Sequence, residues 1–110
     1  MERIAHLRET VGSALDIAVD FHGRVHVPMA KALIHAIELY SPLFIEEPVL
    51  SEHLPAMAEL CGHTHIPIAT GERLFSRFDF KDLFTLSAAD IIQPDLSHAG
   101  GITECKKIAD

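Results

Sequence analysis

Apolar residues follow two alternating patterns along the 110-residue chain. Short apolar runs, too short for buried helices, are typical of strands that are covered on both faces. These runs are residues 15–21, 43–45, 66–69 and 90–92. Apolar residues at helical spacing predict helices in residues 29–40, 54–61, 80–87 and 102–108, and in the first dozen residues. The alternation predicts an α/β fold of about four consecutive strand–helix units with parallel strands.

Residues at the ends of the helical segments agree with this assignment. Pro28 precedes the segment 29–40, where the first turn of a helix tolerates proline. For the segment 54–61, Ser51 is the predicted cap and Gly62 the predicted stop.

A carboxylate recurs near the end of each predicted strand. Asp20, Glu46 and Glu72 are spaced 26 residues apart, and Asp95 follows Glu72 by 23 residues. One strand–helix unit of a (β/α) barrel takes about 30 residues. The spacing therefore predicts that the carboxylates share one edge of the sheet, the edge at which barrel enzymes keep their active sites.

Three acidic side chains that converge on one point repel one another unless a cation joins them. Oxygen ligands alone favour a hard divalent ion, Mg²⁺ ahead of Mn²⁺, over zinc. The alternative interpretation is that strand-end acids cap the following helices, a common role for a single Asp or Glu. Three acids at near-equal spacing favour the metal site, with Glu46 preferred over its neighbour Glu47 by the 26-residue interval.

Basic side chains flank the predicted metal site. His22 lies two residues after Asp20, and strand alternation predicts that the two share a face. Beside a cation, its imidazole is a candidate general acid or base. Arg24 and Arg73 follow two of the acidic strand ends, and each is predicted either to touch substrate oxygens or to form a salt bridge with a neighbouring acid.

Asp95 has two candidate roles. It is placed to cap the helix that follows Gly100 and Gly101. Its functional alternative is to orient a catalytic imidazole from another strand.

The charge of the chain narrows the class of partner. Lys and Arg number 9 against 16 Asp and Glu, which gives a net charge of −7. Nucleic acid and anionic lipid attract basic patches, so we expect neither as a partner.

Cys61 and Cys105 stand outside any CxxC motif and are expected to be buried, unpaired thiols of a reducing cytoplasm. The chain therefore has the character of a cytoplasmic small-molecule enzyme or a piece of one.

Four ordered motifs resemble the enolase superfamily, and within it the mandelate racemase and muconate lactonizing enzyme branch. They are DFHGRVH (Asp20–His26), FIEEPV (Phe44–Val49), GERL (Gly71–Leu74) and IIQPDLSHAGGITE (Ile91–Glu104). The resemblance covers the chain from about Leu15 to its end. It implies a partial TIM-type (β/α) barrel, with residues 1–110 a fragment of the C-terminal barrel domain.

The resemblance also implies a role for each acidic residue. Asp20, Glu46 and Glu72 match the acids that bind Mg²⁺ in that family, and His22 matches the acid that protonates the departing 3-hydroxyl. Asp95 matches the aspartate that pairs with a histidine on the next strand, which abstracts the proton alpha to the substrate carboxylate. The implied reaction is dehydration of a sugar acid through an enediolate, with galactonate as the first substrate and mannonate or gluconate as alternatives.

The chain departs from the family pattern because it stops shortly after the fourth predicted strand. The base histidine is expected beyond Asp110, and the N-terminal capping domain and the remaining barrel strands are expected to be absent. We therefore expect the parent protein to be the dehydratase and this fragment alone to be inactive. The competing hypothesis is a non-catalytic fragment that binds metal, or pairs with a second copy as a homo-oligomer to cover its exposed edges.

Overall fold

The computed structural model describes every residue from Met1 to Asp110. Its elements follow the alternating order predicted from the sequence, and each strand overlaps the run predicted for it. The strands are β1 (Ala18–Asp20), β2 (Phe44–Glu46), β3 (Ile68–Thr70) and β4 (Ile91–Ile92). The helices are α1 (Glu2–Val11), α2 (Val27–Ile37), the 3₁₀ helix η1 (Glu38–Tyr40), α3 (Leu54–Cys61), α4 (Arg77–Thr85) and α5 (Ile102–Ala109).

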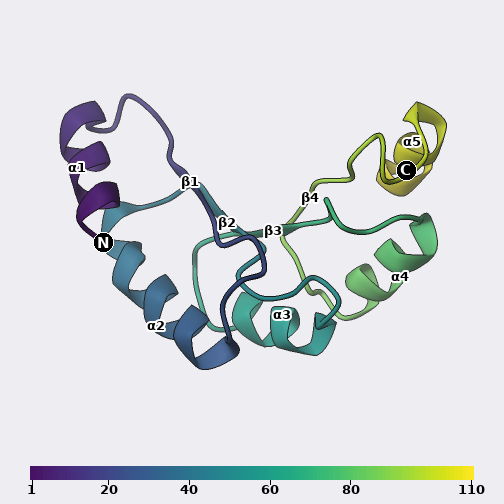
Figure 1. The fold of residues 1–110 in the computed structure, drawn as a ribbon, viewed down its shortest axis with the longest axis horizontal. Coiled ribbons are helices and arrows are strands. Elements are labelled where there is room, and N and C mark those ends of the chain that lie inside the picture. Colours follow the sequence, from purple (N-terminus) through teal and green to yellow (C-terminus); the bar gives the residue numbers. More distant parts are fainter.

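The strands form one parallel sheet in sequence order, β1-β2-β3-β4. Val19 pairs with Ile45, and Ile45 pairs with Ile68. Figure 1 shows α2, α3 and α4 along one side of the curved sheet, with α1 and α5 at its two ends. The α/β architecture and the parallel pairing predicted from the sequence are confirmed.

One face of the sheet meets the helices and contains the core. Register and strand alternation place Val19, Ile45, Ile68 and Ile92 on this face. Ile45 and Ile68 are fully buried in a single hydrophobic cluster to which all three covering helices contribute. The helical members include Ile34 of α2, Met57 and Leu60 of α3, and Phe80 and Leu83 of α4.

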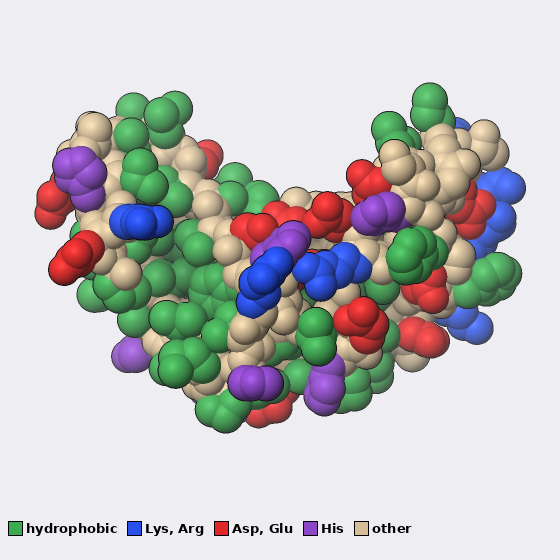
Figure 2. All heavy atoms as spheres, in the orientation of Figure 1, with side chains coloured by type: hydrophobic (Ala, Val, Ile, Leu, Met, Phe, Trp, Pro, Cys, Tyr) green, Lys and Arg blue, Asp and Glu red, His purple; other side chains and the backbone are tan.

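The opposite face is open, which corrects the expectation that each strand is covered on both sides. Phe44, Glu46 and Ile91 on this face are partly exposed, whereas Ala69, which lies between Glu46 and Ile91 in the register, is buried. Figure 2 shows the molecule hollowed on this side, with acidic side chains gathered near the middle. In a closed barrel, inward side chains from the other strands fill such a space, whereas the four strands of this chain do not close on themselves.

The helix ends confirm two of the three predicted signals. Pro28 occupies the first turn of α2, and the N–H of Gly62 closes α3 on the carbonyl of Ala58. The predicted cap at Ser51 is wrong, because α3 starts at Leu54 and its N-cap is His53, whose Nδ1 accepts the N–H of Ala56 at 3.1 Å. The proline that follows Leu54 fits only the first helical turn, which fixes this later start.

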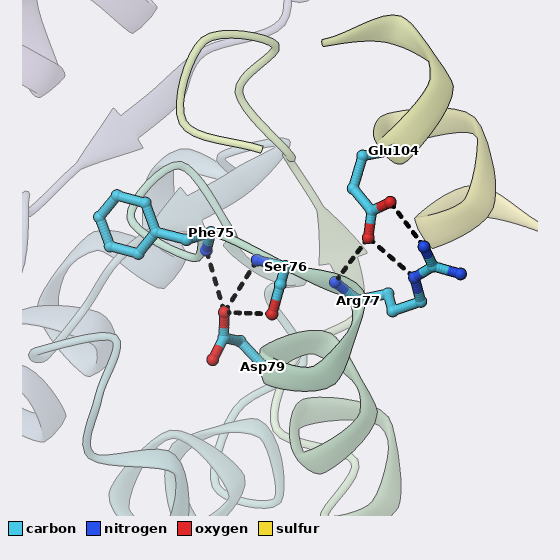
Figure 3. A network of polar contacts seen from close by, with 5 residues as sticks. All are labelled: Phe75, Ser76, Arg77, Asp79 and Glu104. Carbon is cyan, nitrogen blue, oxygen red and sulfur yellow. Dashed lines mark hydrogen bonds and ion pairs between the residues drawn. The ribbon is translucent and has the colours of Figure 1, made fainter. Parts of the chain in front are cut away.

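The start of α4 is fixed by a capping box and a link to α5 (Figure 3). Asp79 Oδ2 accepts the N–H of Phe75 at 3.1 Å, the N–H of Ser76 at 2.8 Å and the hydroxyl of Ser76 at 3.0 Å. Arg77 donates from Nε and Nη2 to the two carboxylate oxygens of Glu104, each at 2.8 Å. With these contacts α4 begins at Arg77, three residues before the start at residue 80 that the spacing of apolar residues predicted.

Two expectations concern the chain as a whole. Cys61 and Cys105 are unpaired, as predicted, although both are half-buried rather than buried. Burial raises the pKa of the Cys61 thiol to about 11. None of the helices combines the length and the apolar character that a membrane-spanning segment requires.

The Asp79 cap is testable by substitution. Burial raises the pKa of Asp79, but hydrogen bonds from the hydroxyl and N–H of Ser76 and the N–H of Phe75 outweigh it, so the pKa lies below its ordinary value. We expect Asp79→Ala to lower the free energy of unfolding by about 1 kcal/mol at neutral pH. The difference from the unchanged protein should shrink as the pH falls through the pKa of the folded carboxyl, because protonation removes the acceptor.

Urea unfolding at neutral and acidic pH measures this effect. Asp82→Ala is the matched control, because Asp82 lies exposed on the same helix and its side chain accepts no hydrogen bond. Equal stability of the Asp79 and Asp82 variants at neutral pH would contradict the cap.

Candidate active site at the carboxyl edge of the sheet

Three carboxylates lie at the carboxyl edge of neighbouring strands. Asp20 is the last residue of β1 and pairs in register with Glu46, the last residue of β2. Glu72 follows β3 by two residues. The pKa of Glu46 is raised by burial first, then by the negative charges of Asp20 and Glu72, while a polar contact with Gln93 opposes the rise. Asp20 and Glu72 are therefore both close enough to Glu46 to disfavour its negative charge.

His22 lies against Asp20, but by a different route from the one predicted. The strand ends at Asp20, and the chain then turns, with His22 in the left-handed region at a φ of 54°. Asp20 Oδ1 accepts the N–H of His22 at 2.6 Å, and the ring Nδ1 lies 3.4 Å from Asp20 Oδ2. The two side chains meet because the chain turns after Asp20. His22 lies outside the strand, so the alternation of strand faces does not determine its position.

The adjacent residues Glu46 and Glu47 occupy opposite environments. Glu46 is partly exposed on the open face of the sheet, opposite Asp20. Glu47 has a φ of 40°, and its side chain is 1% exposed. Its Oε2 lies 3.0 Å from Arg73 Nε in an ion pair that has no aligned hydrogen bond. Burial raises the pKa of Glu47, and the charge of Arg73 opposes that rise.

The two arginines at this edge also differ. Arg73 forms the ion pair that was one of its two predicted roles, and its Nη2 donates to the carbonyl of His22 at 3.1 Å. Arg24 is exposed and makes no ion pair. It lines a shallow cavity of about 220 Å³ together with Val49, Leu50 and other residues of the loops after β1 and β2.

Asp95 stabilises the turn after β4. Its Oδ1 accepts the N–H of Ser97 and the N–H of His98, each at 2.8 Å. The hydrogen bond from His98 is the largest influence on the pKa of Asp95, which lies below its ordinary value. Asp95 thus caps the turn that precedes α5 rather than the helix itself, whose N-cap is Gly101.

Two further residues of this edge were not identified from the sequence. The Nδ1 of His98 lies 2.5 Å from the carbonyl oxygen of Glu72, and its ring lies over Phe75 with centroids 5.6 Å apart. Gln93 is partly buried beside Glu46, with its Oε1 shielded from solvent. Both lie in the motif that contains Asp95, so their position next to a strand end was the available signal.

The donor set of Asp20, Glu46 and Glu72 fits a hard divalent ion. Its ligands are all oxygen, and none of the three acids has a Lys or Arg partner in an ion pair. Their side chains share the sheet edge, but no group of three or more His, Cys, Asp or Glu side chains is arranged to hold a metal ion. Asp20 Oδ1 is instead engaged by the N–H of His22.

Comparison with known proteins gives the family. A family model described as "Enolase C-terminal domain-like" matches residues 1–110. The chain belongs to this enolase family. It is 59% identical over 107 residues to a D-galactonate dehydratase of Ralstonia pickettii and 58% identical to one of Ralstonia nicotianae. Each match covers 97% of this chain and 28% of the relative, so the chain spans just over a quarter of the curated relatives.

Solved structures of enolase-family proteins have the same fold. A mandelate racemase/muconate lactonizing enzyme-like protein from Rubrobacter xylanophilus superimposes with a TM-score of 0.94 at 41% identity, covering 98% of this chain and 27% of that one. An L-talarate dehydratase from Polaromonas, described as complexed with Mg and L-glucarate, gives 0.94 at 34% identity, with coverages of 98% and 30%. The four parallel strands are thus part of an enolase-type barrel, as the motifs implied.

The repulsion at the sheet edge predicts an effect on stability. Without divalent ions, Glu46→Gln removes a charge that lies opposite Asp20, so we expect it to raise the free energy of unfolding by about 0.5 kcal/mol. Thermal unfolding in the presence of a chelator measures this change. Glu52→Gln, at an exposed position without an ion pair, should leave the stability unchanged. A lower free energy of unfolding for Glu46→Gln would contradict the prediction that the charges of Asp20 and Glu72 destabilise an ionised Glu46.

Proposed function

We propose that this chain is a segment of a longer sugar-acid dehydratase whose first substrate is D-galactonate, in the cytoplasm. The observation that carries the proposal is the set of Asp20, Glu46 and Glu72 at one sheet edge with His22 against Asp20. The 59% identity to a D-galactonate dehydratase supports the choice of substrate. The product of such a reaction is a 2-keto-3-deoxy sugar acid.

Asp20, Glu46 and Glu72 would hold Mg²⁺, with Mn²⁺ as the second choice. A bound divalent ion supplies positive charge that offsets the negative charge developing on the substrate carboxylate when the alpha proton leaves. Support comes from the three carboxylates, none of which has a Lys or Arg partner, and from relatives crystallised with Mg, among them the L-talarate dehydratase of Polaromonas. Glu47 is assigned no such role, because Arg73 already balances its charge.

His22 would act as the proton donor to the departing hydroxyl. Its Nδ1 faces Asp20, so Nε2 is the ring atom left to deliver a proton. The hydroxyl then leaves as water, and the enol that remains becomes the 2-keto acid. Asp95 would orient a histidine that removes the alpha proton, and we place that histidine beyond Asp110, outside this chain.

Arg24 is the candidate for contact with substrate oxygens. It is exposed at the rim of the cavity formed by the loops after β1 and β2, and its guanidinium is not engaged in an ion pair. A free guanidinium can bind a carboxylate or hydroxyl oxygens through two N–H groups. Arg73, in contrast, is already engaged by Glu47.

Other sugar acids remain alternatives within the same chemistry. Mannonate and gluconate offer the same carboxylate and neighbouring hydroxyl. The 34% identity to an L-talarate dehydratase supports the inclusion of diacid substrates in the same test.

The metal assignment predicts a loss of ion binding. Replacing Asp20, Glu46 or Glu72 by Ala should weaken Mg²⁺ binding by on the order of a hundredfold, because each removes one oxygen ligand. Calorimetric titration of the metal-free protein measures the affinity. Glu59→Ala is the control, because Glu59 pairs with Lys31 on the helical side. Unchanged affinity in Glu46→Ala with a loss in Glu47→Ala would assign the ligand to the other member of the pair.

The proposed activity predicts keto-acid formation from D-galactonate by the protein as its gene encodes it. His22→Asn should lower kcat by about 10²–10⁴-fold, because it removes the proton donor. The 110-residue chain alone should show no turnover, because we place the base beyond Asp110. A colorimetric assay of 2-keto acids over a panel of aldonic and aldaric acids measures both. No turnover of galactonate by the full protein would overturn the named substrate, and turnover by the isolated chain would overturn the placement of the base.

A further inference from the structure

The loops after three neighbouring strands are joined by one arginine. Arg73 follows Glu72 in the loop after β3, and its Nε lies 3.0 Å from Oε2 of Glu47 in the loop after β2. Its Nη2 donates to the carbonyl oxygen of His22 in the loop after β1, at 3.1 Å. We propose that Arg73, held by the buried carboxylate of Glu47, is a positioning residue that fixes the turn at residues 21–24 and with it the ring of His22.

Glu47 ties Arg73 to this place. The Glu47 side chain is 1% exposed, and a buried carboxylate without a partner is strongly unfavourable. Arg73 is the one cationic side chain in an ion pair with it. Because the guanidinium balances a charge that water does not reach, it is not free to bind the carboxylate of a substrate. This separates Arg73 from Arg24, which has no such partner.

The turn at residues 21–24 needs support from its surroundings. His22 has a φ of 54°, a conformation that a residue with a Cβ atom adopts only when other contacts hold it there. The N–H of Phe21 donates to the carbonyl of Glu46 at 2.9 Å, and the N–H of Gly23 donates to the carbonyl of Glu47 at 2.8 Å. Both of these contacts are between backbone groups.

Two side chains also contact this turn: Asp20 accepts the N–H of His22, and Arg73 donates to its carbonyl. Arg73 Nη2 donates a hydrogen bond to the carbonyl of His22. Gly23 is buried next to the guanidinium, because a Cβ atom at Gly23 would lie 3.5 Å from Arg73 Nη1. Gly23 also has a φ of 65°, a conformation that favours glycine. The guanidinium thus packs against the turn, and its removal leaves the backbone contacts and the Asp20 carboxylate, which accepts the N–H of His22, as the remaining supports.

The consequence for activity rests on the proposed function. If His22 delivers a proton from Nε2, loss of Arg73 shifts the donor and lowers kcat by up to about a hundredfold while KM stays unchanged. A residue that binds the substrate directly, the role assigned to Arg24, would instead raise KM. The two arginines therefore give opposite kinetic signatures on the same sheet edge.

The test uses the protein as its gene encodes it and measures amide hydrogen exchange at residues 21–24. Arg73→Gln should speed exchange at Phe21 and Gly23, because the turn loses the hydrogen bond from Arg73 to the carbonyl of His22. Arg73→Lys keeps a positive charge for Glu47 but lacks the second N–H that reaches His22, so exchange should also rise. The double variant Arg73→Gln with Glu47→Gln removes the unpaired buried charge and should restore the thermal unfolding temperature without restoring slow exchange.

Exchange does not depend on turnover, so it separates the two proposals. Wild-type protein that fails to convert any sugar acid would overturn the proposed function, while the exchange rates still decide the role of Arg73. Unchanged exchange at residues 21–24 in the double variant would overturn the positioning role. A raised KM with unchanged kcat in Arg73→Lys would overturn it as well, because that result assigns Arg73 to substrate binding. Lowered kcat with faster exchange supports it.

Discussion

The pairing of Asp20 with Glu46 at the ends of two parallel strands is the constraint on which this site depends. The register is fixed by the residues before them, because Val19 and Ile45 pair on the face that packs against the helices. A slip by one residue would turn the carboxylates into the core and the core residues outward. Hydrophobic burial on one face therefore determines where negative charge collects on the other.

That collected charge is balanced unevenly. Glu47 is buried and neutralised by Arg73, whereas Asp20, Glu46 and Glu72 have no Lys or Arg partner. Two adjacent residues, Glu46 and Glu47, thus differ in environment, because Glu46 lies on the open face and Glu47 is turned inward at a φ of 40°. An arginine bound to the inner carboxylate leaves the outer acids available to a cation from solution.

The sequence predicted the parts of this arrangement that follow from periodicity. The alternation of strands and helices and the position of Asp20 and Glu46 at strand ends both came from the hydrophobic pattern and a 26-residue spacing, whereas the preference for Glu46 over Glu47 as a metal ligand stays a prediction. The left-handed turns at His22 and Glu47 could not be predicted, because contacts from distant residues hold non-glycine residues there. The sequence also left undecided whether Arg73 forms an ion pair or contacts substrate, because Arg24 follows a strand-end acid in the same way and has the same two alternatives. The cap at Ser51 failed because a proline shifted the helix start.

The open face of the sheet bears on how strongly these groups act. Asp20 and His22 are both partly exposed in this chain, and water screens charges at such positions. In a closed barrel, the remaining strands and their loops surround the same edge and exclude water from it. Each electrostatic contact then becomes stronger, both the repulsion among the acids and the attraction of a cation for them. The electrostatic contacts of Asp20 and His22 therefore depend on how far the surrounding structure excludes water from this sheet edge.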